Sequence, residues 1–225
     1  MNLLGRAEQR LVAAIDPAPI LQRTLDWVAV NSGTGNLAGL AGMAKRLGDA
    51  FAVLPGEIVL EQPTPVETTA SDGTAVAREH GAHLVLRVRP EAERRVLLTG
   101  HMDTVFAPSH PFQQCRWLDG ETLNGPGTAD MKGGLSLMLA GLAAFEDGNR
   151  SLGYDVMINS DEETGSASSA PLIARLAQGK LAALTYEPAL PGGIMARARP
   201  GSGNFALVVH GRSAHAGRNP EDGRN

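Results

Sequence analysis

YDVMINSDEETG, residues 154–165, joins an apolar segment to three consecutive acids and then a glycine. The apolar segment predicts a β-strand. Three adjacent carboxylates repel one another, so folding gains nothing from them unless a positive group lies nearby. Glu162 and Glu163 can serve one site only where the strand ends and the backbone turns, and Gly165 permits that turn. Acids at the carboxyl end of such a strand lie where ligands bind in open α/β sheets; the alternative is a solvated acidic loop.

The sequence on either side of this strand alternates between helix and strand patterns. Apolar positions recur at helical spacing in 133–147 and 167–178. Short strands are predicted at 96–99 and 181–186, before the first and after the second of these helices. Strand, helix, strand, helix and strand in this order indicate an α/β fold with helices on both faces. We therefore expect a mixed, mostly parallel sheet flanked by helices.

The remaining sequence extends this fold in both directions. Earlier in the chain we expect helices at 3–14, 19–30 and 37–51, and strands at 57–60 and 83–89. Later in the chain, short strands are predicted at 194–199 and 205–210. The composition changes near Pro200, which indicates a domain boundary. We expect a catalytic domain over residues 1–199 and the beginning of a small α+β lid or dimerisation domain over residues 200–225.

The composition excludes several classes of partner. The chain has 225 residues, of which 43% are hydrophobic and 20% charged, as in a soluble globular protein. A net charge of -4 and only five Phe, two Trp and two Tyr argue against nucleic acid or a membrane surface as partner. Cys115 is the single cysteine, which fits a reducing compartment. No secretory signal and no membrane-spanning apolar run is visible, so we expect a cytoplasmic protein.

Potential metal ligands follow four predicted strands or loops. They are His101 after the 96–99 strand, Asp130 before the 133–147 helix, the Glu162–Glu163 pair, and Glu187 after the 181–186 strand. Each alone is an ordinary surface residue, but four at successive sheet ends predict a common site. Asp103 could accept the ring N–H of His101, the usual support for a histidine ligand. Nitrogen and oxygen ligands without a thiolate suit zinc, with cobalt or manganese as alternatives.

Asp130 lies in the glycine-rich segment NGPGTADMKGG, residues 124–134. A helix follows directly, and a carboxylate near a helix N-terminus is favourable. Lys132 would be unfavourable there, so we expect its side chain to face the acids. The alternative is a phosphate-binding loop of a nucleotide-binding α/β protein. Its glycines match neither nucleotide fingerprint, and an acid lies where phosphate charge would be.

These motifs together resemble the zinc amidohydrolases that include acetylornithine deacetylase, succinyl-diaminopimelate desuccinylase, aminoacylase and glutamate carboxypeptidase, most closely the glutamate carboxypeptidase-like members. The resemblance implies two Zn²⁺ ions bridged by Asp130, with Glu163 on one ion and His101 with Glu187 on the other. It also implies that Glu162 is the general base and that Asp103 orients His101. The implied reaction is cleavage of an amide bond in an N-acyl amino acid or small peptide by a metal-activated water.

The same resemblance extends to GRSAHAG, residues 211–217, and implies that His215 reaches the partner's active site in a homodimer. Members of the family continue for well over a hundred residues past the point matched by Asn225. The lid, and a late histidine ligand on the Glu163 side, would lie there. We therefore expect this chain to bind one metal well through His101, Asp130 and Glu187, and a second poorly. The competing hypothesis is an inactive fragment or pseudo-enzyme that keeps the fold.

Overall fold

The computed structural model describes residues 4–148, 151–196, 198, 201, 203 and 205–224. Its centre is a five-stranded sheet in the order β1 (Glu57–Glu61), β4 (His83–Val88), β8 (Gly153–Asn159), β5 (Arg95–His101) and β9 (Ala183–Thr185). The β1–β4 and β4–β8 pairings are antiparallel, whereas β8–β5 and β5–β9 are parallel. The expected mixed α/β sheet is confirmed, with its parallel part confined to β8, β5 and β9.

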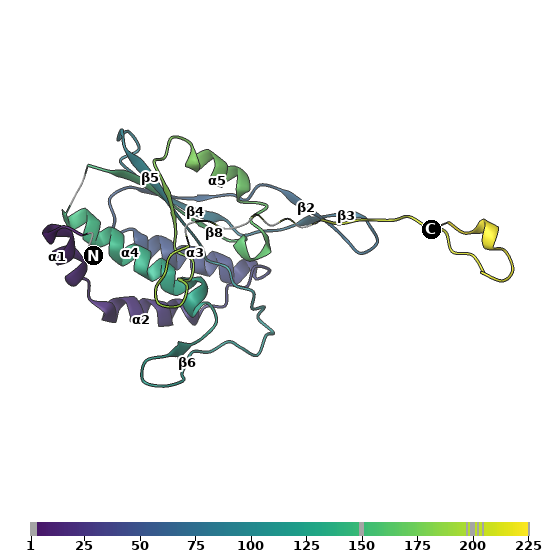
Figure 1. Ribbon diagram of the computed structural model, residues 1–225, viewed down its shortest axis with the longest axis horizontal. Helices are drawn as coiled ribbons and strands as arrows, with labels where there is room; N and C mark the ends of the chain where they lie inside the picture. Colours follow the sequence, from purple (N-terminus) through teal and green to yellow (C-terminus); the bar gives the residue numbers. More distant parts are fainter. Residues whose placement is uncertain are drawn as a thin grey trace.

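Helices cover both faces of this sheet (Figure 1). One face carries α2 (Pro17–Val28), α3 (Leu37–Phe51) and α4 (Gly133–Gly148), and α1 (Arg6–Ala13) contacts α4 at the edge of this layer. The other face carries α5 (Ala170–Ala177). The alternation of β8 explains the division, because Val156 and Ile158 join the larger core while Met157 packs with α5.

Smaller elements lie outside the sheet. β2 (Val66–Thr69) and β3 (Ala75–Arg78) form one hairpin, and β6 (Arg116–Trp117) and β7 (Leu123–Asn124) form another. The segment η1 (Thr128–Lys132) is a kinked turn, with a non-helical backbone at Asp130 and Met131, that leads into α4. The single-turn 3₁₀ helices are η2 (Glu162–Thr164), which follows β8, and η3 (Pro220–Asp222). Within the described residues, no helix combines the length and apolarity needed to span a membrane.

Two predicted boundaries differ from the structure near the expected site. β5 continues through His101, so this residue ends the strand instead of following it. α5 begins at Ala170, three residues later than predicted. The cause is the carboxylate of Asp161, which accepts the N–H groups of Ser168 and Ser169 and holds them in a turn.

The strands predicted late in the chain are wrong for the residues that the structure describes. Ile194 makes only an isolated bridge with Leu190, and residues 205–210 contain no strand. A strand needs a hydrogen-bonded neighbour, and the described chain places none beside them. The C-terminal segment instead extends away from the helices and sheet, past the β2–β3 hairpin (Figure 1). The predicted domain boundary at 199–200 falls outside the described residues and stays a prediction.

Candidate metal centre

His101 ends β5 with a fully buried side chain. Its Nε2 lies 2.8 Å from Asp130 Oδ1, and its Nδ1 lies 3.0 Å from the backbone oxygen of Asp103 and 3.3 Å from Asp103 Oδ1. With the proton on Nδ1, the Nε2 lone pair is presented on the Asp130 side. Burial alone would lower the pKa of His101, but the carboxylates of Asp103, Glu187 and Asp130 outweigh it and raise the pKa to about 9. A metal ion bound at Nε2 would displace that proton.

Three potential ligands from different elements converge at this point. His101, Asp130 and Glu187 each offer one ligand atom, and these atoms all lie within 4.8 Å of one another. The sheet register explains the approach of the first and last. Thr99 of β5 pairs with Thr185 of β9 in parallel, and His101 and Glu187 each follow two residues later. Glu187 Oε1 lies 3.8 Å from His101 Nε2.

Asp130 lies in the kinked turn η1, where its own backbone is non-helical. Gly127 precedes it with a φ of 75°, and the Asp130–Met131 peptide bond is cis. The prediction that Lys132 faces the acids is wrong. Its buried amine donates to the backbone oxygens of Trp27 at 3.1 Å and Val30 at 2.7 Å. These carbonyls, one in the last turn of α2 and one just after the helix, accept the hydrogen bonds of the ammonium inside the protein, and burial lowers the pKa of Lys132 to about 8.

Glu162 and Glu163 lie on η2, where the backbone turns after β8 as predicted. Their backbone N–H groups both donate to the carboxylate of Asp103 at 3.2 Å. Thr34 donates its hydroxyl to the same carboxylate at 2.7 Å. Asp103 therefore ties the end of β5 to the turn that carries the two glutamates. Sequence reasoning missed Thr34, because nothing in its turn-rich segment indicates a partner 69 residues away.

The two glutamates occupy different places relative to the three converging ligands. Glu162 Oε2 lies 3.9 Å from His101 Nε2, and its side chain is 45% exposed. Glu163 is not part of the group of three. Burial, and then the neighbouring carboxylate of Asp130, raise the pKa of Glu163 to about 7, with smaller contributions from Asp103 and Glu162. A cation beside Glu163 would remove this penalty on its charged form.

His215 lies apart from these residues. It belongs to the exposed C-terminal segment, where its Nδ1 accepts the backbone N–H of Gly217. The structure describes a single chain, so the implied contact across a dimer stays a prediction.

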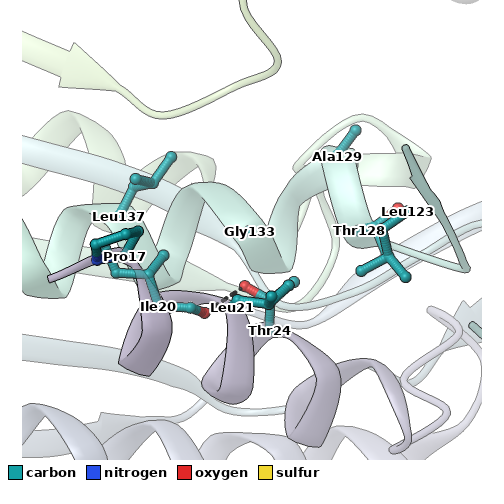
Figure 2. A pocket seen from close by; sticks show the side chains of 9 residues that line it. All are labelled: Pro17, Ile20, Leu21, Thr24, Leu123, Thr128, Ala129, Gly133 and Leu137. Carbon is teal, nitrogen blue, oxygen red and sulfur yellow. Dashed lines mark hydrogen bonds between the residues drawn. The ribbon is translucent and has the colours of Figure 1, made fainter. Parts of the chain in front are cut away.

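An apolar pocket of about 330 Å³ lies beside η1, between α2 and the beginning of α4 (Figure 2). Its walls are Pro17, Ile20, Leu21, Thr24, Leu123, Thr128, Ala129, Gly133 and Leu137. Thr24 uses its hydroxyl within α2, donating to the backbone oxygen of Ile20 at 2.8 Å. None of the candidate ligands lines this pocket, which therefore differs from the converging polar site.

A profile of Peptidase family M20/M25/M40 matches residues 97–214, more than half of the chain. The chain belongs to this family. The match spans His101, Asp103, Asp130, the glutamate pair and Glu187. It confirms the resemblance drawn from the sequence motifs.

Individual relatives agree with this assignment. The chain is 31% identical over 219 residues to carboxypeptidase G2 from Pseudomonas sp. (strain RS-16), a match that covers 95% of this chain and 49% of that protein. The chain thus spans about half the length of this curated relative.

Solved structures share the fold. Aminopeptidase PepT from Bacillus cereus matches with a TM-score of 0.59 and 22% identity, over 93% of this chain and 53% of that one. An M20 family metallo-carboxypeptidase from Sulfolobus solfataricus matches with a TM-score of 0.59 and 16% identity, over 77% and 38% of the two chains. The mixed sheet flanked by helices is therefore the fold of known members of the family.

Proposed function

We propose that this chain forms part of a metal-dependent hydrolase that cleaves an amide bond in an N-acyl amino acid or a small peptide, as a carboxypeptidase or deacylase does. The observation that carries the proposal is the convergence of His101, Asp130 and Glu187 within 4.8 Å at the carboxyl edge of the sheet. Family membership and the likeness to carboxypeptidase G2 support it.

The residues at this edge fit zinc. They offer one imidazole nitrogen and several carboxylate oxygens without a thiolate, and three ligand atoms already converge. We assign His101, Asp130 and Glu187 to one ion and Glu163, with Asp130 shared, to a second. Bound zinc would polarise the amide carbonyl and lower the pKa of the attacking water.

The chain's own side chains then have separate tasks. Glu162, close to His101 and partly open to solvent, takes a proton from the attacking water and returns it to the leaving amine. Asp103 holds the proton on Nδ1 of His101 and so keeps Nε2 available as a ligand. The backbone N–H groups that bind Asp103 belong to Glu162 and Glu163, so the same carboxylate fixes the base relative to the metal ligands.

The Glu162→Gln variant tests the proposal. Removal of the general base is expected to lower the rate of hydrolysis of N-acyl amino acids about 10²–10⁴-fold, while zinc content stays unchanged. Glu67→Gln, on the exposed strand β2, is the matched control and should keep both the wild-type rate of hydrolysis and the wild-type zinc content. An unchanged rate in Glu162→Gln contradicts the assigned base. Absence of hydrolysis in the unmodified, zinc-loaded chain supports the competing hypothesis of an inactive fragment.

A further inference from the structure

His83 is a buried histidine that the proposed reaction does not use. It is the first residue of β4, its exposed fraction is 1%, and it precedes the region matched by the family profile. β4 pairs with β8, so the ring lies at the same edge of the sheet as the end of β8. There it contacts the segment from Ser160 to Ser168, which carries both Glu162 and Glu163.

The hydrogen bonds fix which ring nitrogen carries the proton. The backbone N–H of Ser160 can only donate, and it lies 3.3 Å from Nδ1, which assigns Nδ1 as its acceptor. The hydroxyl of Ser160 also lies 3.4 Å from Nδ1, but it donates its proton to the backbone oxygen of Gly81 at 2.7 Å. The proton of the neutral ring is then on Nε2, which lies 3.4 Å from Ser168 Oγ and donates to it. Ser168 Oγ is free to accept this hydrogen bond, because the proton of its own hydroxyl is donated to Asp161 Oδ2 at 2.9 Å.

Asp161 completes this network inside the protein. Its Oδ2 also accepts the backbone N–H groups of Ser168 at 2.7 Å and Ser169 at 3.2 Å. Burial alone would raise the pKa of Asp161, but the hydrogen bonds from Ser169 and Ser168 outweigh it and lower the pKa. The first of the three consecutive acids therefore holds this turn and is not one of the three converging ligands.

We propose that His83 is a positioning residue for the metal centre: its neutral, Nε2-protonated ring holds both ends of the 160–168 segment and so fixes Glu162 and Glu163. The inference rests on the proposed function, because it concerns the same site. The effect reaches His101 through Asp103, which accepts the N–H groups of both glutamates and contacts the ring of His101. Displacement of the segment would remove the hydrogen bonds that hold the Asp103 carboxylate, and the ring of His101 would then lose its orientation.

This arrangement depends on pH. Burial lowers the pKa of His83, and the charge of nearby His80 lowers it further. The charges of Asp161 and Asp103, and a hydrogen bond that the ring donates to the backbone of Ser168, act in the opposite direction. The folded protein thus keeps the ring neutral below pH 6.5, where the unfolded chain takes up a proton. The resulting stability is fully present above pH 6.5 and is lost as the pH falls towards the folded pKa. Protonation of Nδ1 would turn two donors towards each other, Nδ1–H and the N–H of Ser160.

The first experiment reads the ring directly. Nitrogen NMR of ¹⁵N-histidine-labelled protein at pH 7.5 should show His83 with an unprotonated Nδ1 and a protonated, slowly exchanging Nε2. A ring protonated at Nδ1 overturns the proposal, and this result does not depend on any variant folding.

The second experiment measures zinc affinity between pH 5.5 and 7.5 in three variants. His83→Leu fills the space without an acceptor and should weaken zinc binding about 10–100-fold at both pH values. His83→Asn can accept the Ser160 N–H but cannot be protonated there, so it should bind like the wild type at pH 7.5 and lose less affinity at pH 5.5. His110→Asn is the control, since exposed His110 also accepts a backbone N–H, from Phe112.

Wild-type affinity and pH dependence in both His83 variants would overturn the proposal. His101 is present in the wild type and in every variant, so its own titration changes zinc affinity equally in all of them and does not affect the differences between them. Neither readout needs turnover. If the wild type hydrolyses no amide but the NMR and zinc results are as expected, the proposed function fails and the role of His83 stands.

Discussion

Asp103 is the residue on which most contacts of the candidate site depend. Its carboxylate contacts the ring of His101 and accepts the hydroxyl of Thr34 and the N–H groups of Glu162 and Glu163. A side chain with this many buried partners cannot be removed without leaving several of them unsatisfied. Orientation of the histidine ligand and of the glutamate turn thus depends on one carboxylate.

Asp103→Ala is therefore expected to weaken zinc binding about 10–100-fold, as loss of a carboxylate behind a histidine ligand typically does. Asp119→Ala is the matched control, since exposed Asp119 also accepts two backbone N–H groups, but in the β6–β7 hairpin. Isothermal titration with zinc measures both. An affinity for Asp103→Ala within twofold of the wild type would contradict this role.

At this scale, the sequence predicted residues that follow strands but not those that approach from elsewhere. His101 and Glu187 were predictable because parallel neighbours end at one edge of a sheet. The orientation of the Lys132 side chain was not predictable, because the carbonyls that accept its hydrogen bonds belong to Trp27 and Val30, about a hundred residues earlier in the chain. The same holds for Thr34 and His83, whose partners are fixed only by tertiary packing.

Among the elements, α4 sets the distance between the Asp130 turn and the end of β9. Gly134, in its first turn, lies against the backbone oxygen of Tyr186, and a Cβ there would be 2.2 Å from that oxygen. Glu187 is the next residue along the chain. Close packing of this glycine therefore brings the carboxylate of Glu187 up to the metal centre.

Gly134→Ala is expected to destabilise the protein by about 1–3 kcal/mol, the usual cost of overpacking, and to weaken zinc binding by displacing Glu187. Gly141→Ala lies in the same helix, and its Cβ would meet nothing within 4 Å. That control should be neutral or stabilising by up to about 1 kcal/mol, because alanine favours helix. Denaturant unfolding and zinc titration separate the two variants; equal stability in both would contradict the packing argument.

For the helices and strands too, features set by the local sequence pattern were predictable, and features that depend on tertiary contacts were not. Helices with an apolar stripe and strands within the sheet were predicted in type and order. The bounds of Leu37–Phe51 were predicted correctly, whereas other elements begin or end up to three residues from the predicted positions. The strand predicted at 205–210 was wrong, since alternating apolar residues favour a strand only where a neighbour supplies hydrogen bonds. Phe205 is instead 98% exposed.

The molecule as a whole presents one group of three converging ligands within its described residues, with Glu163 outside that group. We therefore expect one zinc ion per chain to bind tightly and a second to bind weakly. Metal analysis after dialysis against buffers of increasing chelator strength measures this. Two zinc ions retained per chain at the same chelator strength would show the prediction to be wrong.

The central claim is that side chains far apart in the sequence form a single cation site at the carboxyl edge of the sheet. Anomalous diffraction at the zinc absorption edge, from crystals grown with zinc, tests it most directly. The account predicts a strong peak within bonding distance of His101 Nε2 and of the carboxylates of Asp130 and Glu187. A zinc ion bound elsewhere, with no anomalous density between these three side chains, would contradict it.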